Sequence, residues 1–472
     1  MPVTFLRQGL WPLPAFVLFL FLAACSSAPD TVGPQPVQSP NDKLQYRLLT
    51  LDNEMEVLLI SDPNSPKAAA SLDVMVGSGD NPAGRGGLAH FLEHMLFLGT
   101  DKYPDPGEYE RFVTEHGGNR NAYTSLERTN YFFDINAAYL PEALDRFAQF
   151  FIAPRFDADY VEREKNAVQA EYQMGLKSDA RRGLDVLQEV MNQAHPFSQF
   201  AVGSLDTLAD REGSAIRDEL LAFYDRHYSA NQMQLAVLGP QPLDELEALV
   251  APMFAPVPNK SAQLQQVDAP IFAEGSLPLL VQVKPQATRR QLQVLFPVAD
   301  FRDDYRANPL AYVGNLVGHE GAGSLLSQLK SEGLAESLAA GSGLAWRGGS
   351  LFNVSIALTE QGVAAYDRVL QMLFAYLEML RSEGPQESLY AEQSQLAQLD
   401  FRFKEKVDPI NYVSGLTAGM HFYEPEDVLR GPYLMEDFQA PMIEAVLQGL
   451  VPDNALVILD HPGVGTNRVS EH

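Results

Sequence analysis

The segment GLAHFLEHMLFLGT, residues 87–100, contains the pattern from which the rest of the chain is interpreted. On a helix, His90 and His94 lie one turn apart and project from one face, as two imidazoles must to bind one metal ion. Glu93 stands beside that face, where a carboxylate can accept a proton from metal-bound water without being a ligand. The apolar neighbours predict a buried helix, which Gly99 would end. The segment therefore predicts a metal site, the alternative being a structural helix that carries two histidines by chance.

A third protein ligand is needed, because catalytic zinc usually has three and keeps one position open for water. Acidic residues are abundant, so spacing alone cannot choose this ligand. The best local candidate is a predicted helix over residues 157–174, on which Glu164 and Glu171 share a face. A solvated acidic face explains the same pattern equally well, so spacing leaves the third ligand open.

The composition is that of an acidic globular chain. Its 472 residues are 46% hydrophobic and 20% charged, which is enough for a buried core and for two or three domains. The formal net charge of −27 repels nucleic acid, so we expect no nucleic-acid binding. The single cysteine, Cys25, excludes a disulfide framework and a cysteine-based zinc site.

Hydrophobic patterning predicts an α+β chain of two similar domains, each an antiparallel-rich sheet packed with helices. Both halves begin with strand-like runs and continue with helical patterns. They also end alike, since the run at residues 231–238 has a counterpart at 454–459. The expected division is 43–255 for the metal-binding domain, 256–278 for a linker, 279–465 for the second domain and 466–472 for a tail.

The individual elements follow from the same patterns. The predicted strands are 44–51, 55–60, 68–76, 119–124, 129–135, 279–283, 291–296 and 351–357. The predicted helices are 88–98, 106–116, 140–151, 157–174, 214–226, 309–317 and 362–381.

The N-terminal segment has the pattern of a secretory signal. Its apolar run, residues 11–24, is shorter than the roughly 20 residues of a membrane-spanning helix. The sequence LAAC at residues 22–25 resembles the lipobox of bacterial lipoproteins, which implies a signal peptide over residues 1–24 and a lipid on Cys25. A buried free cysteine in an ordinary anchor is the alternative.

The residues after Cys25 suggest where the protein is held. Ser26 at the next position resembles an outer-membrane sorting signal, so we expect an outer-membrane lipoprotein that faces the periplasm. The Ser-, Pro- and Gln-rich composition predicts that residues 25–42 form a flexible tether.

The helical metal motif resembles the inverted zinc motif H-x-x-E-H of the inverzincins. Its surroundings resemble the pitrilysin and insulin-degrading enzyme family, and the likeness covers about residues 43–465. The motifs that resemble the family are GLAHFLEHMLFLGT at 87–100, NAYT at 121–124, NAVQAE at 166–171, HPFS at 195–198 and GHEG at 318–321.

The resemblance implies an insulinase-type half-chamber and a complete ligand set. It implies one zinc ion per chain, held by His90, His94 and Glu171. It also implies that Glu164 supports the ligands without binding the metal.

The resemblance further assigns residues to substrate binding. Asn121 and Ala122 match an edge strand to which the backbone of an extended peptide is added. Phe97 and Tyr123 match side chains that line the cleft near the scissile bond. The residues that match an exosite for the substrate N-terminus are Gly314, Gly318, Glu320, Leu338 and Gly341.

The sequence departs from the family at several of these places. Ala311 and Asn315 stand where the insulin-degrading enzyme has histidines, and Ala340 stands where it has glycine. Arg181 and Leu184 replace aromatic residues of the cleft wall. These departures change the expected pocket preference.

The expected function is that of a zinc metalloendopeptidase for oligopeptides and small unfolded polypeptides, with Glu93 as the catalytic base. Single-chain relatives contain four such domains in two halves, and their second half supplies an Arg and a Tyr that have no match here. The alternative is a half-enzyme or non-catalytic peptide-binding subunit that needs a C-terminal-half partner, or self-association, for activity. The intact motif argues against a third alternative, an inert structural lipoprotein.

Overall fold

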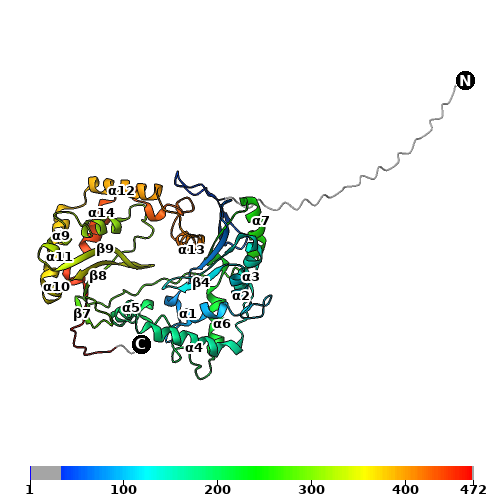
Figure 1. Ribbon diagram of the computed structural model, residues 1–472, viewed down its shortest axis with the longest axis horizontal. Helices are drawn as coiled ribbons and strands as arrows, with labels where there is room; N and C mark the ends of the chain where they lie inside the picture. The colour runs from blue at the N-terminus through cyan, green and yellow to red at the C-terminus, as the bar shows by residue number, and fades with distance from the viewer. Residues whose placement is uncertain (2–32, 470–472) are drawn as a thin grey trace.

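The computed structural model describes Met1 and residues 33–469, which form two lobes, each built around one β-sheet (Figure 1). The predicted signal peptide and Cys25 lie outside the described residues. Within the part of the chain that is described, no helix combines the length and the hydrophobicity that crossing a membrane requires.

The first sheet has six strands in the order β1-β2-β6-β3-β5-β4. Its central strands β3 and β6 are covered on both faces, and both are accordingly apolar along most of their length. β4 lies at the edge of the sheet and pairs with β5. The strands are β1 (Gln45–Thr50), β2 (Glu56–Ser61), β3 (Lys67–Val74), β4 (Asn119–Thr124), β5 (Thr129–Asn136) and β6 (Met233–Gly239).

The second sheet has five strands in the order β7-β11-β8-β10-β9. In each lobe the last strand enters the middle of the sheet, so β6 and β11 each pair parallel with one neighbour and antiparallel with the other. The two similar chain ends noticed in the sequence are these strands. The bounds are β7 (Leu279–Val283), β8 (Gln291–Val298), β9 (Ala335–Trp346), β10 (Gly349–Leu358) and β11 (Leu456–Asp460).

Helices occupy corresponding places in the two repeats. Two helices follow β3 and two follow β8, and a longer series follows the hairpin at the far edge of each sheet. The first lobe contains α1 (Leu88–Leu96), α2 (Glu108–Glu115), α3 (Leu140–Ile152), α4 (Ala158–Gly175), α5 (Asp179–Val190), α6 (Ile216–His227) and α7 (Leu243–Phe254). The second contains α8 (Pro309–Val317), α9 (Leu325–Ser331), α10 (Glu360–Ala364), α11 (Tyr366–Glu383), α12 (Glu387–Arg402), α13 (Pro409–Met420) and α14 (Ala440–Gly449).

The two repeats exchange helices. α13 belongs to the second repeat by sequence, yet its Val413 and Leu416 pack against Leu58 and Ile60 of the first sheet. In return, the segment that ends α5 packs on the second sheet, where Met191 lies in one apolar cluster with residues of β8, β10 and β11. Each sheet is therefore covered on one face by its own helices and on the other face by the other repeat.

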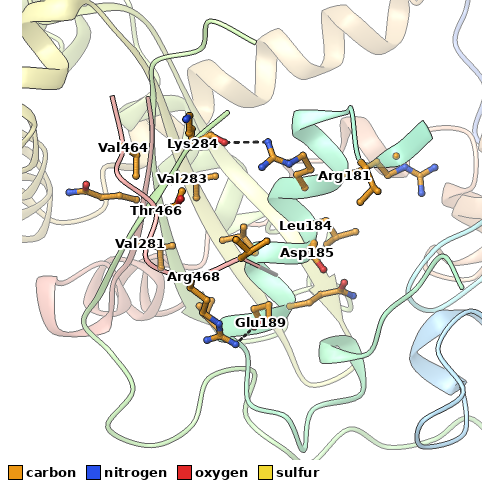
Figure 2. Close-up of a pocket in the computed structure, with 18 of the residues that line it drawn as sticks. Arg181, Leu184, Asp185, Glu189, Val281, Val283, Lys284, Val464, Thr466 and Arg468 are labelled. Carbon is orange, nitrogen blue, oxygen red and sulfur yellow. Dashed lines mark hydrogen bonds and ion pairs between the residues drawn. The ribbon is translucent and has the colours of Figure 1, made fainter. Parts of the chain in front are cut away.

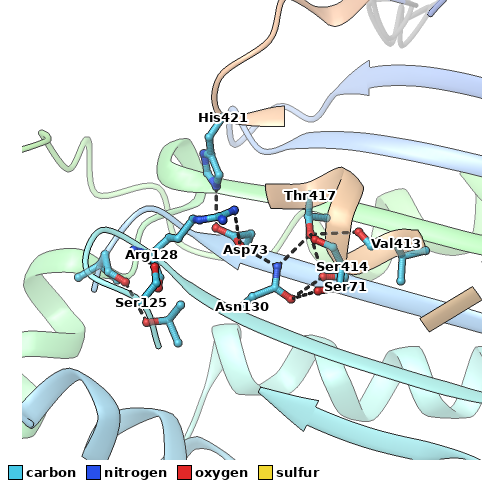
Figure 3. Close-up of polar contacts among 11 residues, drawn as sticks. Ser71, Asp73, Ser125, Arg128, Asn130, Val413, Ser414, Thr417 and His421 are labelled. Carbon is cyan, nitrogen blue, oxygen red and sulfur yellow. Dashed lines mark hydrogen bonds and ion pairs between the residues drawn. The ribbon is translucent and has the colours of Figure 1, made fainter. Parts of the chain in front are cut away.

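A buried polar cluster lies within the contact between α13 and the first sheet (Figure 3). Asn130 Nδ2 donates to Asp73 Oδ2 at 2.6 Å and to Thr417 Oγ1 at 3.0 Å. Its Oδ1 accepts from the Ser71 hydroxyl at 2.9 Å. His421 Nε2 lies 3.0 Å from the other Asp73 oxygen. Because these buried groups meet one another's hydrogen-bonding requirements, they fix how α13 lies on the sheet.

The structure corrects the sequence-based prediction in three respects. Residues 33–42, expected to be part of a flexible tether, lie against the body, and the Val37 amide donates to the Glu426 carbonyl at 2.8 Å. The single helix predicted over 362–381 is divided at Ala365 into α10 and α11. The elements missing from the prediction are α5, α7, α9, α12, α13, α14 and β9.

Candidate metal centre

The helix α1 is held at its N-terminus by close backbone contacts. Gly87 precedes it with a φ of 85°, and a Cβ there would lie 2.2 Å from the Gly203 Cα. Glycine is therefore required at position 87 both for its conformation and for the approach of the loop. The side-chain carbonyl of Asn81 accepts from the Ala89 amide at 2.8 Å and satisfies one of the free amides of the first turn.

The loop that approaches Gly87 also orients His90. The Val202 carbonyl, next to Gly203, lies 2.7 Å from His90 Nδ1. A carbonyl can only accept, so Nδ1 carries the proton and Nε2 is left with its lone pair. This is the tautomer that a metal-binding histidine needs.

The structure brings together the three predicted ligands, His90, His94 and Glu171. Glu171 Oε2 lies 3.4 Å from His90 Nε2, and Oε1 lies 3.6 Å from His94 Nε2. Ligands about 2.0–2.1 Å from a tetrahedral zinc ion are about 3.3 Å from one another. All three ligand atoms fall within 4.8 Å of each other, so the donor set and its spacing fit zinc. Among the described residues this is the one such group of His, Cys, Asp and Glu side chains.

Glu164 lies on the far side of His94 from Glu171. Its Oε2 is 3.5 Å from His94 Nδ1, and the residue sits two turns before Glu171 on α4. Burial lowers the pKa of His94, but the Glu164 and Glu171 carboxylates outweigh burial and raise it to about 9. The neighbouring imidazoles of His90 and His94 hold the pKa of Glu171 well below its usual value. The carboxylates of this cluster therefore stabilise a positive charge placed between them and the imidazoles.

Glu93 projects from the same helix into a buried position beside the ligands. Its side chain is 8% exposed, and burial raises its pKa, although the nearby His90 and a hydrogen bond from Thr124 oppose this. The Thr124 hydroxyl donates to Glu93 Oε2 at 2.5 Å. A carboxylate held this way can exchange a proton with a neighbouring water.

The predicted peptide-binding strand, β4, borders this site. Its side chains alternate, so Asn121 and Tyr123 are exposed on one face while Ala122 and Thr124 turn inwards. Phe97, at the end of α1, is half-buried and stacks with Tyr109, with ring centres 6.1 Å apart. The outer edge of β4 has no strand partner among the described residues, so its backbone groups are available to a peptide.

Two of the predicted exosite residues, Gly314 and Gly341, meet where α8 (Pro309–Val317) approaches the edge strand β9. A Cβ at Gly314 would lie 2.8 Å from the Gly341 Cα, and one at Gly318 would lie 3.4 Å from the Ala340 amide nitrogen. Glu320 is exposed close by in sequence. Leu338 is only 6% exposed and packs in the core, so a ligand there would meet its backbone rather than its side chain.

A cavity of about 1010 Å³ runs along α5 beside the metal site. It is lined by Tyr172, next to ligand Glu171, and by strand β7 on its far side. The Arg182 guanidinium donates to the Lys284 carbonyl at 3.2 Å. Figure 2 shows Arg181 and Leu184 on the side of α5 that lies away from Lys284. The two departures from family pattern therefore line a large space close to the ligands.

Sequence reasoning assigned no role to Thr124, Asn81 or Val202. Thr124 was part of the NAYT motif, and its position two residues after the inward-facing Ala122 is the signal that would have placed it beside α1. Asn81 and Val202 act from distant loops, and no local pattern marks them.

The fold and the site together define an α+β protein of two repeats that carries a ligand set of the zinc type in the first repeat. Three family models match successive parts of the chain: "Insulinase (Peptidase family M16)" over residues 56–207, "Peptidase M16 inactive domain" over 214–396 and "Middle or third domain of peptidase_M16" over 401–471.

Individual relatives agree with these models. The insulin-degrading enzyme of Homo sapiens is 43% identical over 91% of this chain, and the A-factor-processing enzyme of Saccharomyces cerevisiae is 37% identical over 89%. The crystal structure of pitrilysin superposes with a TM-score of 0.90 and 32% identity, covering 93% of this chain and 47% of that one. The chain belongs to the insulinase family, peptidase family M16. It spans 42% and 41% of the lengths of the two curated relatives, and corresponds to roughly their N-terminal half.

Proposed function

We propose that this protein is a zinc metalloendopeptidase that cleaves oligopeptides and small unfolded polypeptides. The observation that carries the proposal is the cluster of His90, His94 and Glu171, with the buried Glu93 carboxylate beside it. Membership of the insulinase family supports the same chemistry.

The roles follow from the position of each residue. A zinc ion held by His90, His94 and Glu171 would polarise the scissile carbonyl and lower the pKa of the attacking water. Glu93 takes a proton from that water and passes it to the leaving amine. Its raised pKa suits both steps, because the protonated form is easier to reach than in an exposed glutamate. The Val202 carbonyl and Glu164 hold the two imidazoles in place.

The substrate class follows from the edge strand. A peptide that pairs with the free edge of β4 is held by backbone hydrogen bonds, which read little of its sequence. Only an extended chain can pair in this way, so folded proteins are excluded while oligopeptides and unfolded segments are accepted.

Chelation tests the proposal. Protein loaded with one equivalent of zinc should cleave an internally quenched peptide, lose this activity in a chelator, and regain it when zinc is added back. Cleavage that persists at full rate after complete removal of metal would exclude a metallopeptidase.

A second candidate is a half-enzyme that binds peptide but turns over slowly without a C-terminal half. Two observations favour it: the chain spans about two fifths of its relatives, and Glu171 is 42% exposed, so the site is open to water. Adding the separately purified C-terminal half of pitrilysin should then raise kcat by about 10²–10³, the effect of one oxyanion-stabilising donor. An unchanged rate when a complex forms would exclude this candidate.

We also propose that Cys25 carries a lipid that anchors the protein to the outer membrane on its periplasmic side. The LAAC sequence at residues 22–25 supports this. Expression in a bacterium with labelled fatty acid should give a labelled protein, while Cys25→Ala should stay unlabelled and unprocessed. Equal labelling of the two proteins would contradict the anchor.

A further inference from the structure

The catalytic carboxylate proposed above depends on one neighbour for its position. In the part of the chain that the structure describes, the Thr124 hydroxyl is the single hydrogen-bond partner of the Glu93 side chain, at 2.5 Å. The buried carboxylate can only accept, so Thr124 must donate its one hydroxyl proton to it. Thr129 Oγ1 lies 3.5 Å from Thr124 Oγ1, much farther than the carboxylate oxygen of Glu93, and its own hydroxyl donates to the Val76 carbonyl at 2.8 Å. The Thr124 proton therefore goes to the carboxylate.

Thr124 is the last residue of β4, and the strand is fixed to α1 at two points. At one point Thr124 contacts Glu93. At the other, the Arg120 guanidinium lies 5.0 Å from the centre of the Phe97 ring. Glu93 and Phe97 are one helical turn apart, and Thr124 and Arg120 are on the same face of the strand. The strand and the helix therefore keep a fixed distance along this contact.

The same strand is the one to which the substrate backbone is expected to add. β4 is paired with β5 on one side and lies at the edge of the sheet on the other. A peptide that pairs with this edge restrains the backbone of β4, and Thr124 is two residues from the backbone of Ala122. Ordering the strand therefore also orders the hydroxyl that holds Glu93.

We propose that Thr124 is a positioning residue: its hydroxyl holds the Glu93 carboxylate in the orientation for catalysis and links that orientation to peptide bound along β4. The inference rests on the proposed peptidase function. A glutamate has three rotatable side-chain bonds, so without this hydrogen bond the carboxylate samples other rotamers. A misplacement of about 1 Å reduces turnover by up to about a hundredfold.

The test compares Thr124→Val, which keeps the shape and removes the hydroxyl, with Thr124→Ser, which keeps the hydroxyl. Thr50→Val, at an exposed end of β1, is the matched control. In Thr124→Val we expect kcat to fall about ten- to a hundredfold while KM changes less than about threefold, with zinc content unchanged. Thr124→Ser and Thr50→Val should keep kcat within about threefold of wild type.

A second comparison separates positioning from a structural role. In the background of Glu93→Gln, adding Thr124→Val should cause no further loss, since the hydroxyl acts through Glu93. A loss of equal size in both backgrounds overturns the proposal, as does equal kcat in the Val and Ser variants or an effect confined to KM.

Crystal structures of the wild type and of Thr124→Val make the test independent of activity. We expect the Glu93 carboxylate to be ordered in the wild type and displaced or spread over rotamers in the variant. If it occupies the same position in both, the proposal is wrong, even where the protein proves to be a peptidase. If the protein cleaves no peptide in any assembly, the proposed function fails, and the crystal structures still decide whether Thr124 sets the position of Glu93.

Discussion

Helices α1 and α8 occupy the same place in the two repeats, yet among the described residues only α1 carries histidines of a candidate metal cluster. Each follows a central strand, β3 or β8, and each packs towards the edge strand of its sheet. Their third, sixth and seventh residues are His90, Glu93 and His94 in α1. In α8 the same positions hold Ala311, Gly314 and Asn315.

The reason for the difference lies in the space between helix and strand. At Gly314 a Cβ would come within 2.8 Å of the Gly341 Cα and 2.9 Å of the Ala340 carbonyl oxygen, so β9 leaves no room for a side chain. At the equivalent place in α1 there is room for the whole Glu93 side chain, with Thr124 reaching across to it. One architecture thus gives a site in the first repeat and a close backbone contact in the second.

Of the changes that separate α1 from α8, removing a predicted metal ligand from α1 should have the largest effect, and it should be seen in the zinc content. His90→Ala leaves two of three protein ligands, so we expect zinc content to fall from about one per chain to below about a tenth. His319→Ala, which removes an exposed histidine of the second repeat, is the control and should keep its zinc. Metal analysis after gel filtration checks this; full zinc in His90→Ala would contradict the assignment.

Changing Glu93 tests the second residue that α1 has and α8 lacks, and it separates the proposed base from the metal ligands. Glu93→Gln should keep zinc and reduce kcat by at least about a hundredfold, because the amide cannot accept the proton of the attacking water. Glu274→Gln, a change at an exposed site between the repeats, should leave kcat unchanged. Steady-state cleavage of a quenched peptide measures both, and a fully active Glu93→Gln would contradict the mechanism.

Filling the space in α8 tests the steric explanation. Gly314→Ala should lower the free energy of unfolding by about 1–3 kcal/mol, because α8 or β9 must move to admit the methyl group. Gly415→Ala in α13 is the matched control, since a Cβ there meets nothing within 4 Å, and it should be neutral or stabilising. Urea unfolding compares the two; equal stabilities would show that the contact does not limit α8.

The smallest expected effect is the change with pH in the free energy of unfolding of the metal-free protein. The pKa of His94 is raised from 6.5 to about 9, so its stabilising contribution is fully present below pH 6.5 and is lost as the pH rises through about 9. We expect a decrease on the order of 1 kcal/mol between pH 6.5 and 9.5, which His94→Gln should abolish and His319→Gln should keep. Urea unfolding with chelator at the two pH values measures it, and a rise in stability over this range would contradict the pKa.

The sequence predicted the elements whose hydrophobic pattern is regular, in both repeats. Strands 119–124 and 279–283 and helix 309–317 were predicted with the observed bounds. α13 was missed because its residues face another repeat's sheet, so no local period marks its buried side. β9 was missed because Gly341 and its small neighbours give no apolar alternation.

The residues of the candidate site also fall into those that a local pattern predicts and those that it does not. His90, Glu93 and His94 share one helix, so their spacing was enough to predict them. Glu171 needed the family resemblance, because nothing in the spacing says that α4 packs on α1. Thr124, Asn81 and Val202 depend on tertiary contacts from separate segments, which a single sequence does not encode in any local pattern.

The exchange of α5 and α13 between the repeats determines how this part of the molecule can move. Two lobes joined only by the linker over residues 256–278 could open about it as a hinge. Here each lobe also holds part of the other against its own sheet, and any hinge motion would expose Leu58, Ile60 and Val413 together. The two lobes therefore move together as one rigid body, so the cluster of His90, His94 and Glu171 keeps its place relative to the second sheet.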